Sequence, residues 1–282
     1  MNYSEYAAID AVNWSTLKEM RVSPKHFLHR KQNGRPDTAA MSLGRAAHAA
    51  LLEPHLMAEY MVWDTALGNR NTNAYRAWKA ELGDREEITQ DDLAKAVAMR
   101  EAVLMHPRAG RYFTGEGENE VVLEWTDTVT GLACKCKLDR ITVIDGIRYV
   151  VDFKTTGVGI TMRKFASQAA TLSYHGQLGF YSTGVRAIYG DDLPIVCIIV
   201  VCESDEPHDC GPMYVGSGIV DMGAALASDL LDRLADCTKA NEWPGQYPAE
   251  VPLDYPEWAM AEDNEIDGLG IEFAPKGVTV NG

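Results

Sequence analysis

Two acidic residues and a lysine in the middle of the chain have the types and spacing of a metal-dependent hydrolytic site. Asp152 and Lys154 end the apolar run Tyr149–Val151, and Asp139 lies 13 residues before Asp152. Side chains two apart on a β-strand project from one face, about 7 Å apart, so Phe153 should pack on the other face. A buried, unpaired carboxylate is costly, and a cation shared with Asp139 would remove that cost. Carboxylates suit Mg²⁺ or Mn²⁺.

Lys154 and the two residues after it each have a functional and a structural interpretation. Lys154 could orient or deprotonate an attacking water and stabilise charge on a phosphorus atom, or it could simply form a salt bridge with Asp152. Thr155 and Thr156 could hydrogen-bond a phosphate, and a turn-forming role for their hydroxyls is an equal alternative. The segment is therefore a candidate for phosphodiester hydrolysis.

The elements that would position these residues follow from hydrophobic periodicity and turn signals. The first part of the chain reads as helical, and the strands follow it. The pair Asp145-Gly146 predicts a tight hairpin. The order predicts a mixed α/β (α+β) fold, in which helices flank a mixed central sheet. The expected helices are 13–31 (with a new start at Pro24), 41–53, several within 55–115, 161–170, 173–189 and 221–239; the expected strands are 121–125, 132–138, 141–144, 147–153 and 194–201.

Length and composition predict one domain with an unusual charge distribution. We expect a single catalytic domain over 1–260, made of a helical part (1–115) and a core (116–260), followed by an acidic, flexible tail over 261–282. The net charge is −15, which argues against nucleic acid, but a local basic run can still bind phosphates. Its candidate DNA-binding residues are Lys18, Arg21, Lys25, Arg30 and Lys31. A solvated helix face is the alternative.

The sequence shows neither a signal peptide nor an apolar run long enough for a membrane span, the longest being 195–202. We therefore expect a soluble cytoplasmic protein without a membrane partner. The 6 cysteines have no CxxC spacing, and we expect reduced, mostly buried thiols.

Several segments together resemble the PD-(D/E)xK nuclease superfamily, and within it the RecE-type exonucleases of phages and prophages. Asp139 with Asp152-Phe153-Lys154 is similar to the superfamily signature, although Leu138 replaces the proline. The resemblance covers roughly residues 3–258 and implies a restriction-endonuclease-like core. The other matching segments are Asn13–Leu17, Ser23-Pro24, Leu43–His48 with Leu52–Pro54, Gln177–Tyr181 (the QxxxY motif), Leu234–Cys237 and Glu242–Pro244.

The resemblance implies roles for residues outside the central motif. His48 would be a metal ligand together with Asp139, Asp152 and the backbone carbonyl of Phe153, whereas a lone histidine on an alanine-rich helix is usually a packed core residue. Gln177 and Tyr181 would line the catalytic site, where core packing is the plainer explanation for the tyrosine. An additional catalytic acid is expected at Glu120, with Glu124 as a rival four residues later.

The implied activity is Mg²⁺- or Mn²⁺-dependent degradation of one strand of linear double-stranded DNA in the 5′→3′ direction, in the cytoplasm of a bacterial host. This would expose a 3′ single strand for a single-strand annealing recombinase, and the nuclease would form a ring-shaped homo-oligomer. An endonuclease with the same site, and a non-catalytic module that binds DNA ends or another protein, are the rivals. A cysteine-ligated iron–sulfur cluster, which some relatives carry, is a weaker alternative.

Overall fold

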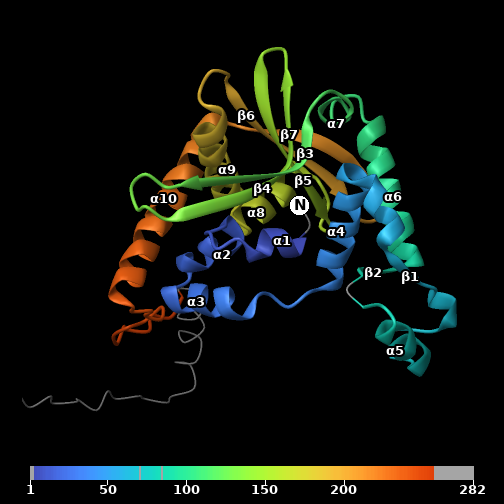
Figure 1. Ribbon diagram of the computed structural model, residues 1–282, viewed down its shortest axis with the longest axis horizontal. Helices are drawn as coiled ribbons and strands as arrows, with labels where there is room; N and C mark the ends of the chain where they lie inside the picture. The colour runs from blue at the N-terminus through green and yellow to red at the C-terminus, as the bar shows by residue number, and fades with distance from the viewer. Residues whose placement is uncertain (1–2, 70, 84, 257–282) are drawn as a thin grey trace, which may run out of the picture. The chain divides into compact units, whose positions relative to one another are not determined.

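A five-stranded mixed sheet forms the centre of the computed structural model, which describes residues 3–69, 71–83 and 85–256 (Figure 1). The strand order is β3-β4-β5-β6-β7. Only the β5–β6 pair is parallel, and the other neighbours are antiparallel. The predicted mixed sheet is therefore confirmed. The strands are β3 (Glu118–Thr126), β4 (Ala133–Ile144), β5 (Ile147–Thr156), β6 (Ile195–Glu203) and β7 (Cys210–Val215).

Strands β4 and β5 carry the central motif and are joined by the expected hairpin. Asp145 and Gly146 have φ of 53° and 75°, the left-handed values that a two-residue hairpin turn requires. The structure corrects two sequence expectations here. Asp139 lies within one continuous strand, β4, and not between two strands, and the edge strand β7 was not anticipated.

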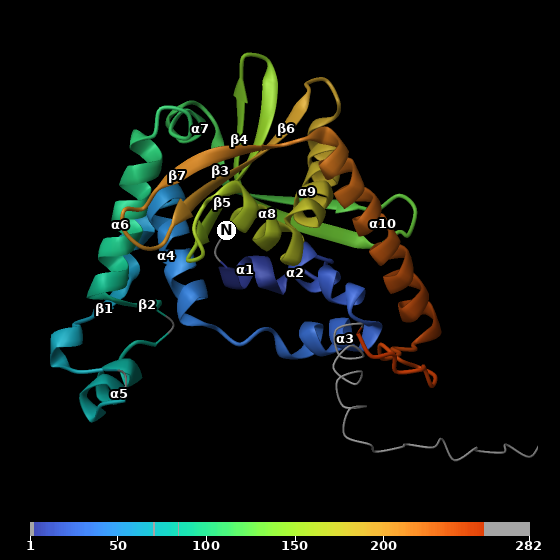
Figure 2. The same ribbon diagram turned by 180° about the vertical axis from the view of Figure 1, so that it is seen from behind.

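One face of the sheet is covered by α9 (Tyr174–Tyr189), α10 (Ser217–Ala240) and the N-terminal helices. Figures 1 and 2 show α9 and α10 on the side of the sheet opposite α4 and α6. A Cβ at Gly179 would lie 2.1 Å from the Ala224 nitrogen, so glycine is required where these two helices meet. The remaining helices of this layer are α2 (Trp14–Leu17), the 3-10 helix η1 (Lys18–Arg21), α3 (Pro24–Asn33) and α8 (Met162–Thr171).

The other face packs against α4 (Ala39–Leu52), α6 (Gln90–Met105) and α7 (Arg111–Thr114). The hydroxyls of Thr38 and Thr89 cap α4 and α6 by accepting backbone hydrogen bonds, a preferred N-cap arrangement. Phe153 is fully buried in this layer. The two cores therefore hold Asp152 and Phe153 of β5 on opposite sides, as strand alternation predicts.

A small subdomain within the part expected to be wholly helical contains two strands, which corrects that expectation. Strands β1 (Met61–Trp63) and β2 (Glu87–Thr89) pair in parallel, and three-residue strands are too short to give a clear alternating pattern. The rings of Trp63, Tyr75 and Trp78 pack together beside them. The other elements of this part are α5 (Asn73–Ala80) and the 3-10 helices η2 (Pro54–Glu59) and η3 (Thr65–Leu67). Helix α1 (Tyr3–Ala8) lies instead beside β4, where Lys135 donates to the Tyr6 carbonyl at 2.6 Å.

The chain divides into two compact units, Met1–Gln246 and Tyr247–Gly282. The first unit contains all the elements named above. The described residues of the second unit, 247–256, form no helix or strand. The predicted acidic tail over 261–282 lies outside the described residues.

Candidate active site

Asp139 lies where strands β4 and β5 separate. The antiparallel pairs between these strands end at Arg140↔Val151, and beyond this point the carboxylate of Asp139 takes the place of a strand partner. Its Oδ2 accepts a hydrogen bond from the backbone N–H of Phe153 at 2.7 Å. The gap left by the separating strands is therefore filled by an acidic side chain that faces the Asp152–Lys154 segment.

Asp152 and Lys154 form a largely buried ion pair. Lys154 Nζ lies 2.6 Å from Asp152 Oδ2, and the two side chains are 16% and 2% exposed. Helix α9 completes their surroundings, because Gln177 Nε2 donates to Asp152 Oδ1 at 2.9 Å and to Tyr181 Oη at 3.1 Å. The ring of Tyr174 lies 5.1 Å from Lys154 Nζ. Gln177 and Tyr181 thus reach the site from one face of α9, as their four-residue spacing predicts.

His48 reaches the same site from helix α4 on the other side of the sheet. Its Nδ1 lies 3.6 Å from Asp139 Oδ2, and its ring packs 5.1 Å from the ring of Phe153. Helix α4 lies close to β5 here, because a Cβ at Gly44 would be in ordinary van der Waals contact with Thr155 Oγ1 at 3.5 Å. His48 therefore belongs to the group of polar residues where β4 and β5 separate.

Glu120 faces Asp139 across strands β3 and β4. The pairs Asn119↔Arg140 and Val121↔Leu138 flank it on either side, so Glu120 and Asp139 hold opposing positions. Glu120 has a φ of 54°, a conformation that costs energy for a residue with a Cβ and is frequent at functional sites. Its carboxylate forms an ion pair with Lys137. Its rival Glu124 lies exposed farther along β3, opposite Lys135.

The donor groups of His48, Glu120 and Asp139 fit a divalent cation. One nitrogen and two carboxylate oxygens lie within 4.8 Å of one another, close to the separation of about 4 Å between opposite ligands of an ion bound at about 2.1 Å. Asp152 Oδ2 is buried beside this group and accepts no hydrogen bond, although it forms the ion pair with Lys154. Such a mixture of oxygen and imidazole ligands suits Mn²⁺ as well as Mg²⁺.

Burial and charge shift the protonation of these groups in a consistent pattern. Burial raises the pKa of the Asp139, Asp152 and Glu120 carboxyls, because the ionised form is disfavoured away from water. Burial and the charge of Lys154 lower the pKa of His48 to about 4, so its imidazole is neutral at pH 7 and able to bind a metal. The burial of these carboxylates thus outweighs the opposing effect of Lys154 and Lys137 on their pKa values.

The pKa of Lys154 shows that the lysine remains a cation. Burial alone would lower this pKa, but the carboxylates of Asp152 and Asp139 raise it overall. The pKa of Tyr181 is raised well above its ordinary value, mainly by burial and by the nearby Asp152. Lys154 is therefore charged and Tyr181 is a neutral phenol at pH 7.

The residues predicted to contact DNA have different surroundings. Burial lowers the pKa of Lys18, and the positive charges of Arg35 and Lys154 lower it further, so Lys18 lies within electrostatic reach of Lys154. Arg21 and Lys25 are exposed. Arg30 pairs with Glu19, and Lys31 pairs with Asp10. Arg21 and Lys25 thus belong to a solvated helix face, whereas Lys18 is the residue of the basic run that interacts with Lys154.

The two threonines after Lys154 also differ. Thr155 is partly exposed beside Gly44. Thr156 is buried, and its hydroxyl donates to Gln168 Oε1 at 2.7 Å. A phosphate contact from the Thr156 side chain does not fit this arrangement.

Lys137 and Tyr174 were not anticipated as members of the site. Lys137 forms the ion pair with Glu120, and the Tyr174 ring faces Lys154. A signal for Lys137 was present in the sequence, because it lies two residues before Asp139 on the same strand. Tyr174 carried no such signal, because only the packing of α9 brings it to the lysine.

The cysteines occupy the sheet and not the candidate metal cluster. Five of the six are buried on strands, and Cys237 on α10 is partly exposed. Cys134 and Cys136 share one core, as expected from their alternation. Burial raises the pKa of both thiols to about 12, so they are protonated at neutral pH.

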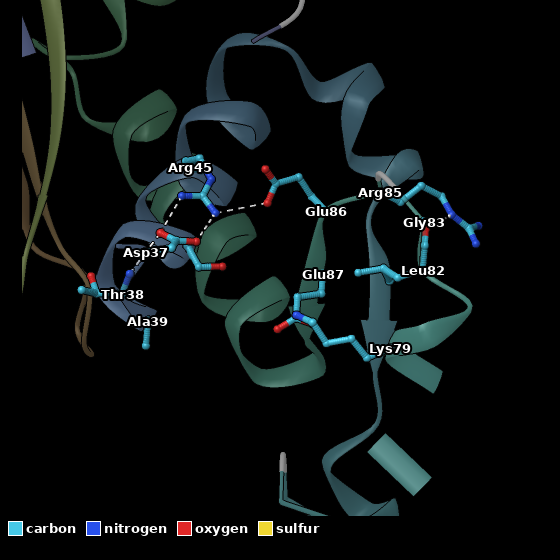
Figure 3. Close-up of a pocket in the computed structure, with 11 residues that line it drawn as sticks. Asp37, Thr38, Ala39, Arg45, Lys79, Leu82, Gly83, Arg85, Glu86 and Glu87 are labelled. Carbon is cyan, nitrogen blue, oxygen red and sulfur yellow. Dashed lines mark hydrogen bonds and ion pairs between the residues drawn. The ribbon is translucent and has the colours of Figure 1, made fainter. Parts of the chain in front are cut away.

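A second charged region lies nearer the start of α4, in a hollow of about 520 Å³. Figure 3 shows Arg45 of α4 between Asp37 and Glu86. The Arg45 guanidinium binds both Asp37 oxygens at 2.9 and 2.7 Å and Glu86 at 3.2 Å. Lys79 pairs with Glu87 at 2.7 Å. Opposite charges in this hollow are matched, and none of the residues predicted as catalytic lines it.

Comparisons with known proteins agree with this architecture. Among curated proteins, no match was found. The solved structure of a protein from Eubacterium rectale described as a "putative exonuclease" is similar with a TM-score of 0.60 and 14% identity, covering 92% of this chain and 95% of that one. A structure of the protein SSO0001 is 12% identical, and the match covers 88% of this chain and 90% of that one. Its TM-score of 0.30 is too low to show a shared fold.

Two further findings complete the description of the chain. Within the described ranges, no helix combines the length and the apolar character needed to cross a bilayer. Residues 13–250 match the family described as "PDDEXK-like domain of unknown function (DUF3799)", which confirms the predicted PD-(D/E)xK relationship and the restriction-endonuclease-like fold. The chain belongs to this PDDEXK-like family.

Proposed function

We propose that this protein is a divalent-metal-dependent deoxyribonuclease that degrades linear duplex DNA from an end. The observation that carries the proposal is the meeting of His48, Glu120 and Asp139 beside the buried Asp152–Lys154 pair. These residues come from three separate parts of the chain. Hydrophobic packing alone gives no reason to gather them, whereas phosphodiester hydrolysis needs metal ligands beside a fixed positive charge.

His48, Glu120 and Asp139 would hold the ion, with Asp152 and the Phe153 carbonyl as the further ligands that the family resemblance implies. A bound Mg²⁺ or Mn²⁺ would activate a water molecule and neutralise charge on the phosphate. Lys154 is a cation, so its role is to orient the nucleophile and to stabilise negative charge on the phosphorus. Gln177 fixes Asp152 through a hydrogen bond. Tyr181 accepts from Gln177, which leaves its own hydrogen available to a phosphate oxygen.

The DNA backbone would approach along the basic side chains of η1 and α3. Lys18 connects this surface electrostatically with Lys154, and Arg21 and Lys25 extend it outward. A local basic surface suffices to bind phosphates despite the net charge of −15. Arg30, Lys31 and Thr155 complete the proposed contacts.

The finer properties rest on the resemblance to the RecE-type branch, carried by His48 and the Gln177–Tyr181 motif. They are exonucleolytic cleavage in the 5′→3′ direction, a 3′ single-stranded product, an annealing recombinase as partner, a ring-shaped homo-oligomer and the cytoplasm of a bacterial host. The Eubacterium rectale protein, described as a "putative exonuclease", adds support for end-dependent cleavage. A ring would keep the enzyme on its substrate between cuts.

The test is digestion of a linear duplex with each strand labelled at a different end, in Mg²⁺ or in Mn²⁺. We expect loss of one strand from its 5′ end, no digestion in EDTA, and resistance of the same DNA as a closed circle. The matched variants are Asp152→Asn and Lys154→Met, which preserve side-chain size. Cleavage retained by both variants would remove this site from the proposal.

Two other outcomes would redirect the proposal. Cutting of the closed circle would identify an endonuclease, which the same metal site can also serve. Tight binding of DNA ends without metal-dependent cleavage would identify a non-catalytic DNA-binding module.

A further inference from the structure

The three candidate metal ligands come from α4, β3 and β4, and the hydrogen bonds of the Asn119 side chain link these three elements. Asn119 precedes Glu120 on β3, and its partner across the ladder, Arg140, follows Asp139 on β4. Asn119 also reaches α4, where Leu52 lies four residues after His48. These adjacent positions raise the question of how the ligands keep a common geometry.

Asn119 makes two short hydrogen bonds, one toward each neighbouring element. Its Nδ2 donates to the Leu52 carbonyl at 2.7 Å, and its Oδ1 accepts from Arg140 Nη1 at 2.7 Å. The Leu52 carbonyl ends α4 and has no partner within the helix. The last turn of α4 contains no basic residue, so Asn119 supplies a cap that the local sequence lacks.

Arg140 anchors this arrangement in the interior. It is 4% exposed, and its guanidinium donates to the Tyr112 carbonyl and, at 2.6 Å, to the Gly115 carbonyl. The planar guanidinium donates hydrogen bonds to three separate partners, which fixes its orientation. Asn119 is therefore held against a rigid group, although it is itself exposed.

The backbone at Glu120 gives an independent reason for such an anchor. A left-handed φ of 54° at a glutamate persists only when surrounding contacts enforce it. The hydrogen bonds of the Asn119 side chain hold the backbone just before Glu120, and the ion pair with Lys137 holds the Glu120 carboxylate. In a regular strand this carboxylate would project elsewhere.

We propose that Asn119, held by Arg140, is a positioning residue that sets the relative placement of His48, Glu120 and Asp139. Its hydrogen bond to the Leu52 carbonyl joins the end of α4 to β3 beside Glu120, where the backbone has the left-handed φ. This link fixes the distance between the imidazole and the two carboxylates. This inference rests on the proposed function, because it assigns Asn119 a purpose in metal binding and not in folding.

The test measures Mn²⁺ affinity of the metal-free protein by electron paramagnetic resonance of free Mn²⁺, together with the melting temperature. Removing groups that orient metal ligands typically weakens affinity by 10–100-fold, and we expect about tenfold for Asn119→Ala. Asn119→Asp keeps an acceptor for Arg140 but loses the donor to Leu52, so we expect a smaller loss. The exposure of Asn119 makes it a site at which both variants should fold.

The matched control is Thr142→Val, two residues after Arg140. Thr142 is buried, and its hydroxyl donates to the Glu116 carbonyl rather than to Asn119 or α4. This variant loses a hydrogen bond of the same β4 region, so we expect a lower melting temperature with unchanged Mn²⁺ affinity. Equal weakening by Thr142→Val and Asn119→Ala would show general loosening and overturn the inference.

A double-variant cycle identifies the route of the effect. If Asn119 acts through α4, then Asn119→Asp should change Mn²⁺ affinity less than twofold in a His48→Ala background. An undiminished effect there would overturn the link to His48. Wild-type protein that binds no Mn²⁺ would refute the metal site of the proposed function. Wild-type binding with unchanged affinity in both Asn119 variants would refute this inference alone.

Discussion

Two lysine–carboxylate pairs in this molecule have nearly the same length but lie in opposite environments. Lys154 pairs with Asp152 at 2.6 Å, and Lys79 pairs with Glu87 at 2.7 Å. The Lys154 side chain is 16% exposed and the Lys79 side chain 53%. Around Lys154 the carboxylates outnumber the cations, whereas around Lys79 and Arg45 acids and bases are matched. The excess of acidic groups therefore distinguishes the candidate active site from the hollow around Arg45, where the charges are balanced.

The largest effect should separate these two lysines. Lys154→Met should reduce metal-dependent cleavage by about a thousandfold, since removing one group that stabilises transition-state charge costs on the order of 10²–10³. Lys79→Met should leave cleavage within about twofold of wild type. Initial rates on a labelled linear duplex measure both. Similar losses in the two variants would show that the Lys154 and Lys79 ion pairs do not differ in their importance for cleavage.

His48→Ala should have the next largest effect, through the metal. Loss of the imidazole removes one of three clustered donors, so we expect Mn²⁺ affinity to fall by at least about tenfold. Part of the cleavage rate should return at high Mn²⁺, because Lys154 and Asp152 remain in place. A titration of rate against Mn²⁺ separates affinity from the maximal rate. An unchanged half-saturating Mn²⁺ concentration would contradict the ligand role.

The partly buried His48 also predicts a pH effect on stability. Burial and Lys154 lower the pKa of His48 from 6.5 to about 4. Between these values the unfolded chain binds the proton more readily, so this group adds stability as pH rises. Relative to His48→Gln, the free energy of unfolding of the metal-free protein should increase from about pH 4 to about pH 6.5 and then remain level. Urea titrations measure this difference, and a flat difference would contradict the lowered pKa of His48.

The smallest effect is expected in the hollow around Arg45. Asp37 is half exposed, and the Arg45 guanidinium holds the pKa of its carboxyl below the usual range. Exposed pairs contribute about 0–1 kcal/mol, so Asp37→Ala should lower the free energy of unfolding by less than about 1 kcal/mol and leave cleavage unchanged. Thermal melts and duplex digestion provide the measurements. A large loss of cleavage would show that this hollow also takes part in the reaction.

The sequence predicted most of what alternates or repeats along a single element. Periods of two and four residues predict the shared face of Asp152 and Lys154 and the pairing of Gln177 with Tyr181 on α9. The Asp-Gly pair predicts the 145–146 turn. The strand β7 and the β1–β2 sheet were missed because short strands give weak patterns. The kink at Glu120 has no local signature, since neighbouring elements impose it.

Long-range contacts explain why parts of the site could not be predicted. Nothing in the sequence marks Asn119 as special, because its partner Leu52 lies 67 positions earlier and contacts it only in the folded protein, at the end of α4. The Lys137–Glu120 pair depends on the register of two strands. His48 was identified by family resemblance, because an imidazole on an alanine-rich helix gives no indication of its partners.

Anomalous diffraction from crystals soaked in Mn²⁺ tests the central claim most directly. We predict a manganese peak at coordination distance from His48, Asp139 and Glu120, beside Asp152, and its loss in His48→Ala crystals at limiting Mn²⁺. A peak confined to the hollow around Arg45, or no ordered manganese in the protein, would contradict the claim.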